Sequence, residues 1–176
     1  MGRGGRRPSR GVAGVQDEPI ETARLRLIPN SPDDVRAQIE KMDARTRKEL
    51  SQDWLARVAA ATGVDPWVLG FTMADRSTAD EIGSCGFKAP PDADGMVEIA
   101  YGVHPEYQNR GYATEAAAAL VTFAFSSGQV RVVRAHTVAE GSASTRVLAR
   151  CGFRSVGQVI EPEDGLVWRW ETNGTG

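Results

Sequence analysis

Residues 97–116 have the sequence VEIAYGVHPEYQNRGYATEA, in which the pattern of a strand gives way to that of a helix. Successive side chains of a strand point to opposite faces, so Glu98 shares one face with Ala100 and Gly102. The other face carries larger residues: Val97, Ile99, Tyr101 and Val103. A carboxylate therefore lies beside two positions with almost no side chain. Gly102, near the strand end, also suggests a β-bulge or a close approach of another backbone.

The segment after this strand predicts an anion-binding helix start. Pro105 ends the strand, and the loop enters an alanine-rich helix through the spacing Gln108-x-x-Gly111-x-Ala113. Small residues there leave the first amide groups of the helix accessible, and these groups with the helix dipole suit a pyrophosphate. Arg110 adds positive charge. The chain has no Walker loop and no G-x-G-x-x-G motif, and an ordinary glycine-containing helix entry is the alternative interpretation.

Outward from this stretch, periodicity and turn residues predict a mixed α/β chain. The expected strands are 23–28, 67–74, 82–88, 96–103, 130–138, 153–160 and 166–171, and the expected helices are 32–42, 52–61, 111–125 and 142–151. Short connections between strands favour antiparallel neighbours, whereas the 111–125 helix makes a crossover. The resulting order is β-α-α-β-β-β-α-β-α-β-β, with a mostly antiparallel central sheet flanked by helices.

The 176 residues carry a formal net charge of -2 and are 41% hydrophobic, which fits one globular domain. We expect this domain over 19–172, with a flexible Arg/Gly-rich tail at 1–18 and a flexible C-terminus at 173–176. The tail has two interpretations, a solvated terminus or a basic arm that touches RNA. The near-neutral charge argues against a nucleic-acid binder, and the chain lacks an apolar run of the ~20 residues that span a membrane.

The cysteines and histidines predict neither a disulfide framework nor a metal site. Cys85 and Cys151 form no C-x-x-C pair, and His104 and His136 have no metal-ligand spacing to each other or to the cysteines. We therefore expect no metal. We expect both thiols to be packing residues in a reducing compartment, the cytoplasm.

Residues 97–116 resemble the fourth strand and the acyl-CoA pyrophosphate loop of the GNAT superfamily of N-acetyltransferases. The sequence STRVLARCGF at 144–153 resembles the helix and G-F turn that follow in this family. TARLRL at 22–27 and GFKAPP at 86–91 are similar to the branch that acetylates ribosomal-protein N-termini. The resemblance covers roughly 21–171. It implies the GNAT fold, acetyl-CoA as the donor and a primary amine, such as a protein N-terminal α-amine, as the acceptor.

The resemblance also implies roles for particular residues. Glu98 matches the strand carboxylate that serves as general base, often through water, and Ser144 is a hydroxyl that either binds the cofactor or assists the departing thiolate. The residues that would hold acetyl-CoA are Val103, Gln108, Asn109, Arg110, Gly111, Tyr112, Ala113 and Thr114. Two structural interpretations stay open: Glu98 as a salt-bridged strand residue, and Ser144 as a first-turn helix residue.

The sequence departs from the family's pattern at two positions. Gly141 stands where many members have Asn, and Leu148 stands where many have a Tyr general acid. These departures keep a second class of function open, a non-catalytic acyl-CoA sensor or scaffold. The acidic residues of the last connection either attract a cationic amine or form a solvated turn; they are Glu161, Glu163 and Asp164.

The acceptor stays open between a protein N-terminus and a small amine, such as a polyamine, an amino acid or an aminoglycoside. The expected partners are therefore acetyl-CoA and an amine. A homodimer is an open alternative, and neither a membrane nor nucleic acid is expected as a partner.

Overall fold

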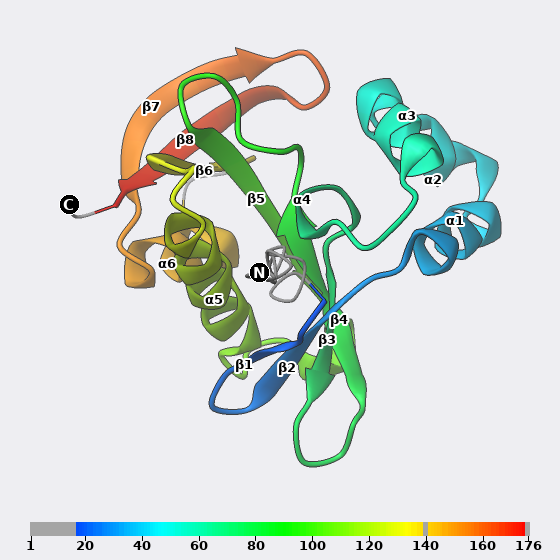
Figure 1. Ribbon diagram of the computed structural model, residues 1–176. Coiled ribbons are helices and arrows are strands. Elements are labelled where there is room, and N and C mark those ends of the chain that lie inside the picture. Colours follow the sequence, from blue (N-terminus) through cyan, green and yellow to red (C-terminus); the bar gives the residue numbers. More distant parts are fainter. Residues whose placement is uncertain (1–16, 139–140, 175–176) are drawn as a thin grey trace, which may run out of the picture.

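The computed structural model describes residues 17–138 and 141–174 and shows one eight-stranded sheet with helices packed against it (Figure 1). The strands are β1 (Ile20–Glu21), β2 (Leu25–Pro29), β3 (Phe71–Asp75), β4 (Glu81–Phe87), β5 (Met96–Val103), β6 (Val132–Thr137), β7 (Arg154–Glu161) and β8 (Gly165–Asn173). They lie in the order β1-β2-β3-β4-β5-β6-β8-β7, and in the described part only β5 and β6 pair in parallel. The expected fold, a mostly antiparallel sheet flanked by helices, is confirmed.

The helices are α1 (Pro32–Lys41), α2 (Ala44–Lys48), α3 (Gln52–Ala60), α4 (Pro66–Leu69), α5 (Tyr112–Ser126) and α6 (Ala143–Arg150), with a 3₁₀ turn at Pro105–Tyr107. Serine or aspartate side chains cap the N-termini of most of them, as Ser31 does for α1 by accepting from the N–H of Asp34. Figure 1 shows α1, α2 and α3 gathered at one side of the molecule, away from α5 and α6.

The first half of the chain differs from the expected order of elements. The structure adds β1, α2 and α4, and the strand expected at 67–74 is wrong over its first residues. The Asp65 carboxylate accepts a hydrogen bond from the N–H of Trp67, and Pro66 occupies the first turn, so a short helix forms before β3. Residues 66–69 are all buried. A short apolar run of this kind does not distinguish a buried helix from a strand.

The expected domain limits, 19–172, stay a prediction. β1 begins at Ile20, and β8 ends at Asn173, the first residue of the expected flexible C-terminus. Gly174 then donates its backbone N–H to the carbonyl oxygen of Arg131 at 3.3 Å, which holds the end of β8 beside the start of β6. Residues 1–16 of the expected tail and residues 175–176 lie outside the described part.

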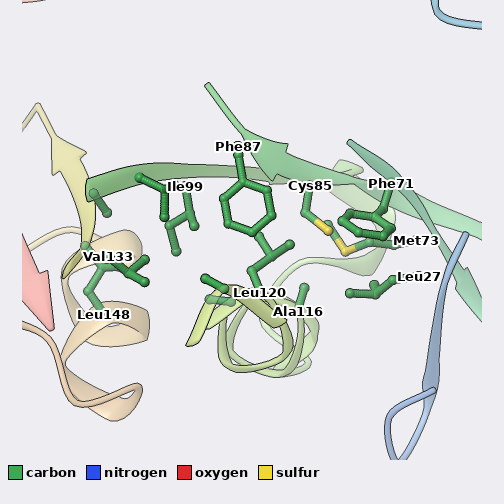
Figure 2. Packing of buried hydrophobic residues seen from close by; sticks show 14 of the residues in the cluster. Leu27, Phe71, Met73, Cys85, Phe87, Ile99, Ala116, Leu120, Val133 and Leu148 are labelled. Atoms are coloured by element: carbon green, nitrogen blue, oxygen red, sulfur yellow. The ribbon is translucent and has the colours of Figure 1, made fainter. Parts of the chain in front are cut away.

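Helix α5 lies across the sheet and forms the centre of the hydrophobic core (Figure 2). The side chains that it turns to the sheet have no exposed surface; they are Ala116, Ala117, Leu120 and Ala124. Three of these four are alanines, and small residues allow the helix to approach the strands closely. Leu148 of α6, also fully buried, extends this core toward Val133 of β6.

Strands β5 and β6 are paired over a short distance only. Met96–Glu98 lie beside Val132–Arg134, and beyond these residues β5 continues with β4 while β6 continues with β8. The sheet therefore opens between the two strands just after Glu98. Glu98 of β5 and His136 of β6 line one cavity at this opening.

The β-bulge suggested at Gly102 does not occur, because the register between β4 and β5 runs without interruption from Gly83 to Phe87. The alternative, a close approach of another backbone, is present. A Cβ atom on Gly83 would overlap the carbonyl oxygen of Gly102, whereas a Cβ on Gly102 would meet open space. The sequence therefore correctly indicated a close approach of two backbones at Gly102, but the residue that must be glycine for this approach is Gly83 on the neighbouring strand.

Truncating the centre of α5 tests this packing. Leu120→Ala should lower the free energy of unfolding by about 2–5 kcal/mol, because it leaves a cavity between α5 and the sheet. Leu166→Ala is the matched control, since the Leu166 side chain is 59% exposed, and it should change stability by less than about 0.5 kcal/mol. Chemical denaturation of both variants measures the difference. Equal stabilities would contradict the described packing of α5.

Candidate active site

The loop between β5 and α5 ends in a helix start without a side-chain cap. Asn109 and Gly111 both have positive φ angles, 62° and 84°, and Gly111 is the N-cap residue of α5. Gly111 has no side chain to bind the first amide groups of the helix, and these groups keep their hydrogen-bonding capacity for a ligand. The Gln108 side chain donates to the carbonyl oxygen of Val103 at 3.0 Å and ties the loop to the end of β5.

Arg24, in the turn between β1 and β2, holds this loop from the other side. Its guanidinium donates to the carbonyl oxygen of Arg110 at 2.9 Å and to the Glu115 carboxylate at 2.9 Å. The same group lies 4.4 Å from the centre of the Tyr112 ring. These contacts join residues far apart in the sequence, and the periodicity of neither segment indicates them. Arg24 therefore orients the first turn of α5.

Glu115, which accepts hydrogen bonds from Arg24, is held as a negatively charged carboxylate. Burial raises its pKa, but hydrogen bonds from Thr22 and from the backbone and side chain of Arg24 outweigh burial and lower the pKa overall. The negative charge lies within the first turn of α5, where the helix dipole favours it.

A cavity of about 480 Å³ lies between this loop, the end of β5 and helix α6. Its lining includes seven of the eight residues expected to hold the cofactor: Val103, Gln108, Asn109, Gly111, Tyr112, Ala113 and Thr114. Arg110, the eighth, does not line it; its guanidinium lies 5.6 Å from the centre of the Tyr107 ring. Arg146 and Arg150, one turn apart on α6, line the opposite wall and were not expected from the sequence.

A second cavity, of about 200 Å³, lies where β5 and β6 diverge. Glu98 and His136 line it from the two strands, and Lys88 and Asp164 line it from the connections that follow β4 and β7. Tyr101 and Ser144 line both cavities, so the two spaces adjoin at these residues. The structure thus brings Glu98 and Ser144, the two expected catalytic residues, to one cavity.

The Tyr101 hydroxyl is held as a phenol at this junction. Burial raises its pKa, and a hydrogen bond with the Ser144 side chain lowers it by less, so the pKa is raised overall. Leu148, at the position where many family members have Tyr, is fully buried in the core. Tyr101 was not expected as a site residue, because its strand pattern indicated only a core-facing position.

Two basic side chains contact the same oxygen of Glu98. His136 Nδ1 lies 2.7 Å from Glu98 Oε1, and Lys88 Nζ lies 2.8 Å from it. The other ring nitrogen of His136, Nε2, accepts from Arg169 Nε at 3.1 Å. An arginine only donates, so this contact leaves the proton on Nδ1, and His136 donates to Glu98. The His136 side chain is only 6% exposed, which fixes the ring in this orientation.

Lys88 is held as an ammonium ion. Burial lowers its pKa, but the hydrogen bond with Glu98 and the charges of Glu98, Asp164 and Glu163 outweigh burial and raise the pKa overall. The Lys88 side chain remains 44% exposed, so the ion pair is open to solvent on one side.

The sequence missed His136, Lys88 and Arg169. Alternation in β6 places Arg134 and His136 on one face, opposite the buried Val133 and Ala135, and this was the available signal. This alternation places His136 near Glu98 only when β5 and β6 pair in parallel with Glu98 beside Arg134, and local sequence pattern does not predict that pairing.

Both cysteines are free thiols in packed surroundings, as expected. Burial raises the pKa of Cys85 to about 12. Burial is also the main cause of the raised pKa of Cys151, whose Sγ lies 3.4 Å from the carbonyl oxygen of Thr114. Within residues 17–138 and 141–174, no group of three or more His, Cys, Asp or Glu side chains is placed to hold a metal ion. The same residues contain no helix that is long and apolar enough to cross a membrane.

The sequence profile of the acetyltransferase (GNAT) domain matches residues 21–154, and the chain belongs to this family. It is 29% identical over 91 residues to the "Uncharacterized N-acetyltransferase YjdG" of Bacillus subtilis (strain 168), a match that covers 52% of each chain. The chain thus spans about half the length of the curated relatives it matches.

Solved structures share the fold at lower sequence identity. An acetyltransferase of the GNAT family from Bacillus anthracis superimposes with a TM-score of 0.63 at 20% identity, covering 88% of this chain and 98% of that one. The aminoglycoside acetyltransferase AAC(6')-Ib, solved in complex with coenzyme A, superimposes with a TM-score of 0.60 at 17% identity, covering 85% and 95%. The expected superfamily is confirmed.

The raised thiol pKa values predict slow alkylation. At about pH 8 an unperturbed cysteine is partly thiolate, whereas Cys85 should be almost entirely protonated and unreactive. Iodoacetamide should therefore label Cys85 far more slowly in the folded protein than in the denatured protein, as followed by mass spectrometry. Equal rates in both states would show that Cys85 is exposed.

Proposed function

We propose that this protein transfers the acetyl group of acetyl-CoA directly to a primary amine. The observation that carries the proposal is the meeting of two cavities at Tyr101 and Ser144, one beside an uncapped helix start and the other around a carboxylate. An acetyl transferase needs both parts, an anion site for the donor and a proton acceptor for the amine.

The larger cavity fits the donor. The amide groups at the start of α5 suit the pyrophosphate, and Gly111 allows a close approach because it has no side chain. Arg146 and Arg150 add positive charge on the opposite wall, which suits a polyanion. Acetyl-CoA supplies an activated thioester; the residues of the loop and of α6 bind it and orient it toward Ser144.

Glu98 acts as the general base in this proposal. Its Oε1 atom is held by His136 and Lys88, and within the described residues the hydrogen bond and ion pairs of this carboxylate are formed by Oε1. Oε2 is therefore available to accept the proton of the incoming ammonium group, directly or through water, because only the free amine attacks a thioester. His136 contributes by fixing the orientation of the carboxylate.

Ser144 supports the departure of the thiolate. It lies in the first turn of α6 and binds the Tyr101 hydroxyl where the cavities meet. Tyr101 stays protonated, so the pair offers a hydroxyl proton to the sulfur without the tyrosine that many family members carry on α6. A thiolate is also a stable leaving group near neutral pH, which reduces the need for a strong acid.

The charges around the smaller cavity favour an acceptor with a single ammonium group. Glu98 and Glu161 already have cationic partners within 2.8 Å, Lys88 and Arg169, and Asp164 lies 3.8 Å from Lys88. A polyamine or an aminoglycoside would need several unpaired carboxylates.

The rim of the smaller cavity is apolar. Val138, which lines the cavity, is 78% exposed, and Ile160 and Leu166 on the hairpin that carries Asp164 are 81% and 59% exposed. This combination of one charge site and an apolar rim suits the α-amine of a polypeptide. The cytoplasm, where thiols remain reduced and newly made N-termini are available, suits both the substrate and the two free cysteines.

The amine acceptor is identified by release of the CoA thiol. The protein is incubated with acetyl-CoA and, separately, a peptide with a free N-terminus, spermidine or kanamycin. The proposal expects amine-dependent release of thiol, with the largest rate for the peptide. A non-catalytic sensor would bind CoA in calorimetry yet release no thiol with any amine, and a faster rate with spermidine or kanamycin would identify a small-amine enzyme.

Gly111→Val tests the donor site. Valine is strained at a φ of +84°, and the distorted helix start should lose a charge-assisted hydrogen bond to the pyrophosphate. We expect the KM for acetyl-CoA to rise about 10–100-fold, since such a bond contributes ~1.5–3 kcal/mol.

Two controls separate this effect from general strain. Gly128→Val places the same residue at a φ of +74° just beyond the other end of α5, and it should leave this KM unchanged. Acetyl-pantetheine, a donor without a pyrophosphate, should react equally with wild type and Gly111→Val. An equal loss of reactivity with both donors would indicate general strain, and an unchanged KM for acetyl-CoA in folded Gly111→Val would place the pyrophosphate elsewhere.

Glu98→Gln tests the base. Turnover should fall by about 10²–10⁴-fold, the usual effect of removing a positioned base, while CoA affinity changes little. The loss should shrink as the pH rises, because more of the acceptor amine is then deprotonated in solution. Glu81→Gln is the matched control: Glu81 is also a strand carboxylate beside a histidine, 3.3 Å from His104, but lies on the exposed surface. Equal pH–rate profiles for Glu98→Gln and wild type would assign Glu98 a structural role.

A further inference from the structure

Lys88 places a primary amine of the protein itself beside the proposed base. It directly follows β4 and lines the smaller cavity together with Glu98, Tyr101 and Ser144. Its Nζ atom lies 2.8 Å from Glu98 Oε1 and 3.8 Å from Asp164 Oδ2. An amine, a carboxylate and the junction with the donor cavity are therefore gathered in one space. Acetyl transfer requires these three features: a nucleophilic amine, a proton acceptor and access to the bound donor.

Lysine is rare in this chain. Of 21 lysine and arginine residues, only Lys41, Lys48 and Lys88 are lysines. An arginine would pair with Glu98 equally well, but a guanidinium does not deprotonate in proteins and is no acceptor. Position 88 thus carries the basic side chain that can become a nucleophile.

We propose that Lys88 is a self-acetylation site, modified by the acetyl-CoA bound to the same molecule. The inference rests on the proposed function, since it uses the same donor and the same base. Lys88 Nζ gives a proton to Glu98, and its lone pair forms a bond to the thioester carbonyl carbon. The carbon–sulfur bond breaks, the attacking nitrogen loses its second proton, and CoA leaves as a thiolate that takes up this proton. The product is a neutral Nε-acetyl amide, and the proton on Glu98 returns to solvent.

The local charges distinguish this reaction from chemical acetylation in solution. Glu98, Asp164 and Glu163 stabilise the ammonium form of Lys88 more than burial destabilises it, so its pKa is raised. Without a positioned base, Lys88 should therefore react more slowly with acetyl-CoA than an ordinary exposed lysine. Lys41 and Lys48, both exposed on the helices α1 and α2, serve as internal references.

The test is to incubate the full-length protein with isotope-labelled acetyl-CoA and no other amine. The label at each lysine is followed by mass spectrometry after digestion with a protease that does not cleave at lysine. We expect Lys88 to be labelled at least about tenfold faster than Lys41 and Lys48, because the reactants are held together. The rate constant should not depend on protein concentration, and added CoA should slow labelling of Lys88 alone.

Glu98→Gln distinguishes self-acetylation with Glu98 as the base from chemical acetylation in solution, because the two reactions predict opposite changes in the labelling of Lys88. If Glu98 is the base, labelling of Lys88 falls while that of Lys41 and Lys48 is unchanged. If the label is chemical, loss of the carboxylate lowers the pKa of Lys88 and labelling rises. Lys88→Arg should keep the cation and remove only the Lys88 label, with circular dichroism as the check on folding.

Labelling of Lys88 no faster than that of Lys41 and Lys48 overturns the proposal. If the amine panel shows turnover in that case, the proposed function stands and only the self-acetylation falls. If thiol release is absent with every amine and CoA does not bind, the proposed function fails and the inference fails with it.

Discussion

Strands β5 and β6 pair over only three residues, Met96–Glu98 with Val132–Arg134, and then follow different neighbours. This divergence is the constraint on which the site depends. A fully paired sheet would leave no cavity beside Glu98 and His136, whereas a sheet without the three paired residues would not hold these two side chains 2.7 Å apart. The buried face of α5, rich in alanine, holds the strands together beneath the opening.

Glu98 is held in a fixed orientation by charge as well as by position. The Glu98 side chain is only 18% exposed, and a carboxylate largely removed from water is costly unless it is paired and hydrogen-bonded; both His136 and Lys88 contact its Oε1 atom. His136 is fixed in turn by Arg169, which also binds Glu161 at 2.7 Å. The network thus extends from β5 through β6 to the β7–β8 hairpin, and the turn of this hairpin, with Glu163 and Asp164, is exposed.

The donor side depends on a contact between distant parts of the chain. The start of α5 requires two positive φ angles, at Asn109 and Gly111, and Arg24 binds the carbonyl oxygen of Arg110 from 86 residues earlier. The turn after β1 therefore also stabilises the loop before α5. It supports the backbone whose amide groups are proposed to hold the pyrophosphate.

The sequence by itself determined the features that depend on residues close together in the chain, such as the faces of a strand and the start of a helix. Strand alternation located Glu98, and Gly111 before an alanine-rich run located the helix start, because periodicity and backbone conformation are local properties. It failed at Trp67, where an apolar run allowed either a strand or a helix and the Asp65 cap decided. Only the tertiary structure brought Lys88 and His136 to Glu98 and Arg24 to the loop. These contacts follow from which strands pair and where they separate, and no pattern within one segment encodes the position of another.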